Sequence, residues 1–256
     1  MCELFGASSA GPRGYSRWLS ALRLRGGLQA DNPDGWGVAT WHEGRAMVEK
    51  SPEPGWTSGR FLEIAHGARS ALVVAHVRKA RHPPSPGLRN THPFAHACCD
   101  REWVFAHNGL VPVGADCPSA CHPEGETDSE TAFCRLLADI ASEYDADEHG
   151  RWVGRLARAA SAIALTGKFN FLLSDGRLLV AYGHDRLHFL ETPSREAGVA
   201  LVATEAITDD PWRAFEPGEL RAYRDGRLLA RLAAQPGTPG RPPSRILHAP
   251  SHGDRP

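Results

Sequence analysis

The sequence contains no apolar run long enough to cross a bilayer and no excess of charge of one sign. Lysine and arginine total 29 residues against 30 aspartates and glutamates, a formal net charge of -1. Proteins drawn to nucleic acid or to an anionic membrane by their overall charge carry a basic excess, so we predict neither partner. The apolar fraction of 41% is ordinary for a globular protein, and 256 residues are enough for a substantial core.

The sequence also lacks a secretory signal and a dense cysteine pattern. The Gly-Pro-Arg-Gly run at residues 11–14 interrupts the apolar residues near the N-terminus, where a signal peptide needs a continuous apolar segment. Six cysteines in a chain of this length are not the framework of a small disulfide-stabilised secreted domain. We therefore predict a cytoplasmic protein whose thiols are reduced.

Hydrophobic periodicity predicts strands, then two helices, then strands again. This order favours helices packed on antiparallel or mixed sheets over an alternating strand-helix array. A Pro, Gly, Ser and Arg-rich stretch at residues 235–256 is predicted to be a disordered tail, which leaves one domain over residues 2–234. The predicted strands cover residues 2–8, 38–41, 46–50, 71–78, 103–109, 169–174, 178–182, 187–190, 199–203, 220–223 and 228–232, and the predicted helices cover 15–24, 57–66, 127–141 and 151–165.

The second residue is a candidate nucleophile. If Met1 is removed, which the small side chain of Cys2 permits, Cys2 carries a thiol and a free α-amine on the same carbon. An N-terminal amine has a reference pKa of about 8, so it can exchange protons with a thiol near neutral pH. The alternative is that Cys2 merely follows the start codon and is buried, as free cysteines usually are.

Three further positions combine a polar residue with the end of a predicted element. Arg78 ends an apolar strand, Asn108-Gly109 ends another, and Asp128 lies in a Thr-Asp-Ser-Glu run that matches a helix capping box. Each position has a simpler explanation. Arg78 could form a surface ion pair, Asn108-Gly109 a hairpin turn, and Asp128 could stabilise its helix by about 0.3–1 kcal/mol.

Six motifs, taken together and in this order, resemble those of class II glutamine amidotransferases, which are N-terminal nucleophile hydrolases. The chain is most similar to the stand-alone members, the group that includes the γ-glutamyl amidohydrolase of ergothioneine synthesis. The resemblance implies an α+β fold, a four-layer αββα sandwich. The motifs are Met-Cys at 1–2, Asp-Gly-Trp-Gly at 34–37, Ala-His-Val-Arg at 75–78, Asn-Thr-His-Pro-Phe at 90–94, Phe-Ala-His-Asn-Gly at 105–109 and Thr-Asp-Ser-Glu at 127–130.

The resemblance also implies roles for individual residues. Cys2 would attack the substrate, with its own α-amine as the general base. The Asn108 side chain and the Gly109 backbone N–H would bind the developing oxyanion. Arg78 would bind the α-carboxylate of a glutamyl group, and Asp128 its α-ammonium. Charge recognition at both poles suits the chemistry, since a guanidinium binds a carboxylate in a two-pronged geometry.

The rest of the substrate pocket is predicted less directly. His82, His92 and the backbone around Gly35 and Trp36 are expected to line it. The Lys-Ala-Arg run at residues 79–81 departs from the aromatic residue or threonine that family members often carry there. The expected substrate is glutamine or a γ-glutamylated small metabolite, hydrolysed to glutamate and ammonia or an amine. Any synthase that accepts the ammonia would be a separate protein.

Two other functions fit the same sequence. The chain could be a hydrolase of non-glutamyl amides, which would be indifferent to the α-carboxylate of a glutamyl group. It could also be a catalytically silent binding module that keeps Met1 and partners a synthase. Intact mass separates this last alternative, because a retained methionine leaves no free amine on Cys2.

No cofactor or metal is predicted. Cys117 and Cys121 have a spacing that zinc sites allow, and Cys98-Cys99 lies upstream, but a second tight Cys/His pair is absent. Cys134 falls on the apolar side of its predicted helix, so its simplest role is that of a core residue. The Asp-Gly-Trp-Gly run at 34–37 lacks the Lys-Ser/Thr pair of a phosphate-binding loop, so a nucleotide site is not predicted either.

Overall fold

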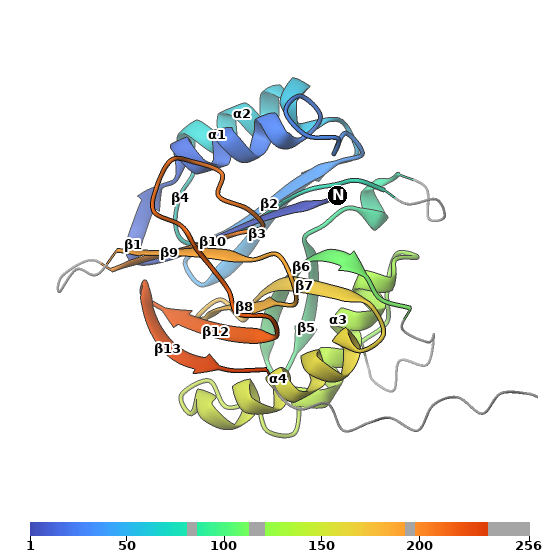
Figure 1. Cartoon of the computed structure of the whole chain (residues 1–256), viewed down its shortest axis with the longest axis vertical. Helices are drawn as coiled ribbons and strands as arrows, with labels where there is room; N and C mark the ends of the chain where they lie inside the picture. Colours follow the sequence, from blue (N-terminus) through green and yellow to red (C-terminus); the bar gives the residue numbers. More distant parts are fainter. Residues whose placement is uncertain (81–85, 113–120, 193–197, 235–256) are drawn as a thin grey trace, which may run out of the picture.

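The computed structural model describes residues 1–80, 86–112, 121–192 and 198–234, and its strands form two antiparallel sheets (Figure 1). The predicted tail at residues 235–256 lies outside the described residues. The first sheet has the order β11-β9-β10-β1-β4-β2-β3. Its strands are β1 (Glu3–Gly14), β2 (Trp36–His42), β3 (Arg45–Ser51), β4 (Arg69–Val77), β9 (His188–Thr192), β10 (Val199–Ala203) and β11 (Arg213–Ala214).

The second sheet has the order β13-β12-β8-β7-β6-β5. Every neighbouring pair within it is antiparallel, as in the first sheet. Its strands are β5 (Phe94–Cys98), β6 (Arg101–Leu110), β7 (Lys168–Ser174), β8 (Leu179–Gly183), β12 (Glu219–Arg224) and β13 (Arg227–Leu232).

Helices cover the outer face of each sheet, and the two sheets face each other (Figure 1). The first sheet packs against α1 (Ser16–Arg25) and α2 (Gly59–Gly67), and the second against α3 (Asp128–Ile140) and α4 (His149–Ala164). Alternation along the strands builds the layers, since Leu4 belongs to the core between the sheets and Phe5 to the core under α1 and α2. The predicted four-layer αββα sandwich is confirmed.

Short-range signals account for the helix starts. The Ser58 hydroxyl accepts a hydrogen bond from Phe61 N–H, and the Thr127 hydroxyl accepts one from Glu130 N–H. The capping box predicted at residues 127–130 is only half formed, because the Glu130 carboxylate binds Glu124 N–H and Gly125 N–H instead of the cap residue. Glu130 therefore orders the segment that leads into α3.

The structure differs from the sequence prediction in two strands. The first strand, predicted to end at Ser8, continues as β1 to Gly14 beside β4, with a shift in register between Ser8 and Arg13. The strand β5 was not predicted. Its hairpin turn to β6 has positive φ at Cys99 and Asp100, 57° and 59°, a conformation that Asn-Gly usually signals in a sequence.

Cysteine pairing also differs from the prediction. Cys121 and Cys134 form a disulfide, so this pair is not reduced as expected, although Cys134 lies in the core of α3 as predicted. The zinc alternative for Cys117 and Cys121 loses one ligand, because the Cys121 sulfur is bonded to Cys134, and Cys117 lies outside the described residues. Within the described part of the chain, no helix has the length and apolar character needed to span a membrane.

Candidate active site

The start of β1 and the end of β4 bring the predicted nucleophile to the edge of the first sheet. Glu3 pairs with Val77 in the antiparallel register, so Cys2 and Arg78 leave the sheet side by side. The backbone after Arg78 then contacts the thiol: Lys79 N–H donates to Cys2 Sγ at 3.2 Å, and the thiol donates to the Lys79 carbonyl at 3.3 Å. These are the thiol's hydrogen bonds within the described residues.

Asn108 reaches the same point from the second sheet. Along β6 it lies on the same face as Val104 and Ala106, which pack in the core between the sheets. Its side-chain amide Nδ2 donates to the Cys2 carbonyl oxygen. The structure therefore brings the predicted nucleophile and the predicted oxyanion-binding side chain together, although they are 106 positions apart in sequence.

Gly109 is a position where no other residue fits. Its φ is 155°, and a Cβ atom placed there would lie 1.8 Å from the Lys168 carbonyl oxygen on the neighbouring strand. A side chain would force β6 and β7 apart at the point where Asn108 meets Cys2. The close approach of the two backbones explains the glycine.

Arg78 is a buried cation with hydrogen-bonding capacity to spare. The residue is 4% exposed, and its Nη1 atom has no hydrogen-bond partner among the described residues. Burial lowers the pKa of Arg78, while nearby Cys2 and Asp34 oppose that shift. An arginine stays charged even so, and a buried cation needs an anionic partner. Arg78 Nη1 is therefore a donor that an anionic group such as a carboxylate could satisfy.

The loop before β2 fixes the backbone of Arg78. Arg78 N–H donates to the Gly35 carbonyl at 2.7 Å, and Asp34 N–H donates to the Arg78 carbonyl at 3.0 Å. The Asp34 carboxylate also accepts from Ala80 N–H at 2.8 Å. The segment that contacts the thiol is thus held from the side opposite to Cys2.

Asp128 opens α3 and keeps acceptor capacity for a ligand. Its carboxylate accepts from Val111 N–H at 2.7 Å and from Ser129 N–H at 2.8 Å. The Ser129 hydroxyl is a third, longer contact at 3.3 Å. A carboxylate offers about four lone-pair positions, so these bonds orient the group without saturating it. Its place in the first turn, next to the Thr127 cap, also suits a negative charge.

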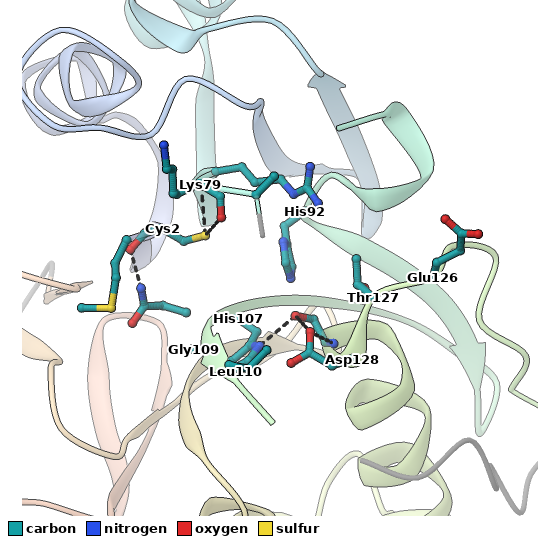
Figure 2. Close-up of a pocket in the computed structure, with 14 residues that line it drawn as sticks. Cys2, Lys79, His92, His107, Gly109, Leu110, Glu126, Thr127 and Asp128 are labelled. Carbon is teal, nitrogen blue, oxygen red and sulfur yellow. Dashed lines mark hydrogen bonds between the residues drawn. The ribbon is translucent and has the colours of Figure 1, made fainter. Parts of the chain in front are cut away.

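A pocket of about 410 Å³ connects these residues (Figure 2). Figure 2 shows Cys2 and Lys79 on one side, Thr127 and Asp128 on the other, and His92 between them. The volume is that of a small-molecule site. The lining residues are Met1, Cys2, Arg78, Lys79, Ala80, His92, His107, Asn108, Gly109, Leu110, Glu126, Thr127, Asp128 and Ser129.

Three buried histidines lie at or behind the pocket wall. Burial lowers the pKa of His76 to about 3 and lowers those of His92 and His107 as well. All three are therefore neutral near pH 7. His107 Nε2 donates to the Lys168 carbonyl at 3.1 Å, so its Nδ1 accepts from the Ser129 hydroxyl at 2.8 Å.

The thiol of Cys2, the predicted nucleophile, is protonated at rest. Burial raises the pKa of the Cys2 thiol, and the Lys79 N–H bond and the Arg78 charge only partly oppose this. The thiol is therefore present as S–H at neutral pH, and attack on a substrate needs a base. Among the described residues no histidine is hydrogen-bonded to this thiol.

Not every residue predicted for the pocket lies in it. Trp36 is buried on the opposite side of β2, where it stacks on Phe61 under α2, and Gly35 supports Arg78 through its carbonyl. Neither is among the lining residues, so the prediction that they line the pocket is corrected. His92 does line it. His82 lies outside the described residues.

Sequence reasoning missed the residues that hold the pocket wall. The Asn90 carboxamide accepts from Glu126 N–H at 2.9 Å, and the Glu130 carboxylate is hydrogen-bonded to the His96 ring at 3.0 Å. These contacts fix the loop that carries the far wall of the pocket. Asn90 and Glu130 stand within motifs quoted above, but only the fold pairs them with these partners.

Solved structures with the same architecture give the fold class. The crystal structure of a predicted glutamine amidotransferase from Pseudomonas aeruginosa superposes with a TM-score of 0.67 at 26% identity, covering 90% of this chain and all of that chain. The glutamine phosphoribosylpyrophosphate amidotransferase of Bacillus subtilis superposes with a TM-score of 0.64 at 16% identity, covering 90% of this chain and 49% of that one, a likeness in fold. The fold is that of the N-terminal nucleophile hydrolases.

Sequence comparison then gives the family. Residues 1–197 match the class II glutamine amidotransferases. The putative glutamine amidotransferase YafJ of Escherichia coli K12 is 33% identical over 87% of this chain and 97% of that protein. The gamma-glutamyl-hercynylcysteine sulfoxide hydrolase of Mycolicibacterium smegmatis is 30% identical over 77% and 81%. The chain belongs to the class II glutamine amidotransferases, and it is an enzyme of the amidotransferase and amidohydrolase type.

Proposed function

We propose that this enzyme hydrolyses a γ-glutamyl amide through an acyl-enzyme on Cys2. The observation that carries the proposal is the arrangement of one pocket. A thiol and an amide donor, Cys2 and Asn108, lie at one end, and a buried cation and a carboxylate, Arg78 and Asp128, also line it. A glutamyl group has a reactive carbonyl, an α-carboxylate and an α-ammonium, so each of these pocket groups has a partner on it.

Arg78 and Asp128 bind the glutamyl half of the substrate. The unpartnered Arg78 Nη1 supplies a donor to the α-carboxylate, and the free lone pairs of Asp128 accept from the α-ammonium. Charge-assisted bonds of this kind are about twice as strong as neutral ones. His92 contributes to the wall beside them, and recognition is independent of what is attached to the γ-carbonyl.

Acylation begins once Met1 has been removed. The α-amine of Cys2 takes the thiol proton while sulfur forms a bond to the γ-carbonyl carbon, and the carbonyl π electrons move onto oxygen. Asn108 Nδ2 and Gly109 N–H donate to this oxyanion. The protonated amine then passes its proton to the leaving nitrogen as the C–N bond breaks, which leaves a thioester and frees ammonia or an amine.

Deacylation repeats the same steps with water. The α-amine removes a proton from water as the water oxygen attacks the thioester carbon. The C–S bond then breaks, the sulfur takes that proton back from the ammonium, and glutamate is released with the thiol and the free amine restored. The substrates we propose are glutamine or a γ-glutamylated small metabolite. The reaction needs a reduced Cys2, which suits the predicted cytoplasmic location, and any synthase that uses the ammonia is a separate protein.

The removal of Met1 is part of the proposal. With Met1 attached, the Cys2 nitrogen is an amide and has no lone pair available as a base. Met1 also lines the pocket, so its removal would enlarge the space beside the thiol. The buried histidines do not replace the amine, since none is hydrogen-bonded to the thiol among the described residues.

Intact mass spectrometry with 6-diazo-5-oxo-norleucine tests the proposal directly. This glutamine analogue alkylates a nucleophile that lies in a glutamine-shaped pocket. We expect a chain without Met1 that gains one adduct, and a Cys2→Ala variant that gains none. Glutamate release from glutamine and from γ-glutamyl-p-nitroanilide, measured on the same samples, then compares two leaving groups.

Two results would overturn the proposal. A chain that retains Met1 and gains no adduct would make the silent binding module the better explanation. A chain that hydrolyses amides without a glutamyl α-carboxylate as fast as glutamine would favour the non-glutamyl hydrolase. Cys98→Ala is a matched control, because Cys98 is a free cysteine away from the pocket and its loss should leave the adduct unchanged.

A further inference from the structure

Asn170, a residue outside the pocket, lies directly behind the predicted oxyanion donor. It pairs with Asn108 across β6 and β7, and its side chain is fully buried on the same face. Its position on the inner face follows from strand alternation, since Leu172 two residues later packs in the core between the sheets. A buried primary amide must satisfy two donors and one acceptor group, and its partners here define its orientation.

Three backbone donors fix the oxygen of Asn170. Its Oδ1 accepts from the N–H groups of His184, Asp185 and Arg186 at 2.8, 3.0 and 3.2 Å. Backbone N–H groups can only donate, so the oxygen must face this loop between β8 and β9. The amide nitrogen of Asn170 therefore has to face the other way.

The nitrogen of Asn170 in turn fixes Asn108. Nδ2 lies within hydrogen-bond distance of three acceptors: the Asp185 carboxylate at 2.8 Å, the Asn108 carbonyl at 3.2 Å and the Asn108 side-chain oxygen at 3.3 Å. Its two hydrogens serve all three, so one hydrogen is shared between two acceptors. Because Oδ1 of Asn108 is engaged by a donor, the Asn108 NH₂ group points away from Asn170. That direction is toward Cys2, whose carbonyl it contacts.

We infer that Asn170 is a positioning residue for the reaction: it holds the Asn108 amide with its NH₂ group toward the nucleophile. The inference rests on the proposed function, in which that NH₂ group stabilises the oxyanion. Without Asn170 the Asn108 amide could turn by 180° about its last side-chain bond. The turned amide would present an oxygen to a developing negative charge, which opposes the reaction.

Asn170→Asp tests the donor of Asn170, which contacts Asn108, separately from its acceptor, which contacts the loop between β8 and β9. An aspartate keeps the acceptor that binds the three backbone N–H groups but has no donor for Asn108. Its second oxygen would face the Asp185 carboxylate, which lies 2.8 Å from Asn170 Nδ2, and two carboxylates at that distance repel. The variant is therefore made together with Asp185→Asn and compared with Asp185→Asn alone. We expect kcat for glutamine hydrolysis to fall about tenfold with KM nearly unchanged, since one buried hydrogen bond sets the orientation. Asn170→Ala removes both the donor and the acceptor, and we expect a lower melting temperature in addition.

Asp185→Asn is the matched control. It changes the charged acceptor of the Asn170 amide and removes its negative charge, but it leaves the bonds to Asn108 in place. We expect its kcat to stay within about twofold of the wild-type value. A tenfold loss in this variant as well would assign the effect to local charge and overturn the inference.

A double-mutant cycle with Asn108→Ala decides between positioning and general structural support. If Asn170 acts through Asn108, Asn170→Asp costs no further kcat once the Asn108 side chain is gone. Losses that multiply, a change in KM instead of kcat, or an unchanged kcat in Asn170→Asp would overturn the inference. A wild-type chain without hydrolysis or adduct would instead overturn the proposed function and, with it, this inference.

Discussion

The two ends of the pocket are built in different ways. The thiol end is formed by strand ends from both sheets, and the contacts to Cys2 come from the Lys79 backbone and from an amide held across the sheets. The other candidate pair consists of charged side chains: Arg78, whose Nη1 has no partner within the described part of the chain, and Asp128, which has lone pairs to spare. Rigid backbone suits an oxyanion that forms briefly, and unsatisfied charge suits a ligand that must bind and leave.

Removing the amide donor tests the thiol end and should have the largest effect. We expect Asn108→Ala to lower kcat by about 10²–10³ with little change in KM, the usual loss for one oxyanion donor. Steady-state kinetics on glutamine checks this, with the melting temperature as a control for folding. A rise in KM at constant kcat would place Asn108 in substrate binding instead.

Changing the cation tests the binding pair. Arg78→Lys keeps the charge but loses the two-pronged geometry, so we expect kcat/KM for glutamine to fall about 10-fold to 100-fold, mainly through KM. The control is 4-aminobutanamide, which lacks the α-carboxylate. The variant should hydrolyse this amide no more slowly than the wild type does, and an equal loss on both substrates would contradict the assignment.

The buried histidines near both ends should make the fold sensitive to acid. Their pKa values are lowered in the folded state, so below pH 6.5 the unfolded chain binds more protons than the folded chain. Stability should therefore fall as the pH drops from 7 toward 5, by about 1 kcal/mol per pH unit for each histidine that stays neutral. Urea unfolding at several pH values measures this.

Two histidine variants test whether the buried histidines cause this dependence of stability on pH. His76→Gln should make the pH dependence shallower, because one buried neutral histidine is gone. His42 is exposed, with 82% of its side-chain surface accessible, and His42→Gln should leave the slope unchanged. Equal slopes in all three proteins would contradict this account of acid sensitivity.

The smallest effect comes from comparing two helix caps of the same kind. Ser58→Ala and Thr127→Ala each remove one cap hydrogen bond, and each should cost about 1 kcal/mol of unfolding free energy. Thr127 lines the pocket and precedes Asp128, whereas Ser58 caps α2 on the outer layer. Only Thr127→Ala should raise KM, and a rise in both variants would show that the caps act through overall stability.

Most helices and strands could be predicted from short-range patterns. The Ser58 and Thr127 caps, the apolar repeat of α3 and the Asp225-Gly226 turn, with φ of 51° and 72°, are local features that the sequence displays. The strand β5 was not predicted, because its turn uses Cys99 and Asp100, residues that seldom adopt positive φ. The place of Trp36 was also missed, because alternation alone does not say which face of a strand meets the pocket.

The sequence alone determined the motifs and most helices and strands, because caps, turns and alternation act between residues close in the chain, and the layers of the fold followed from the family resemblance. Tertiary structure decided how those residues meet. The Cys2 thiol depends on the Lys79 backbone, 77 positions away, and the Asn108 amide depends on Asn170, 62 positions away. Hydrogen bonds of this range follow from the register of neighbouring strands within each sheet, and that register is set by how the whole core packs.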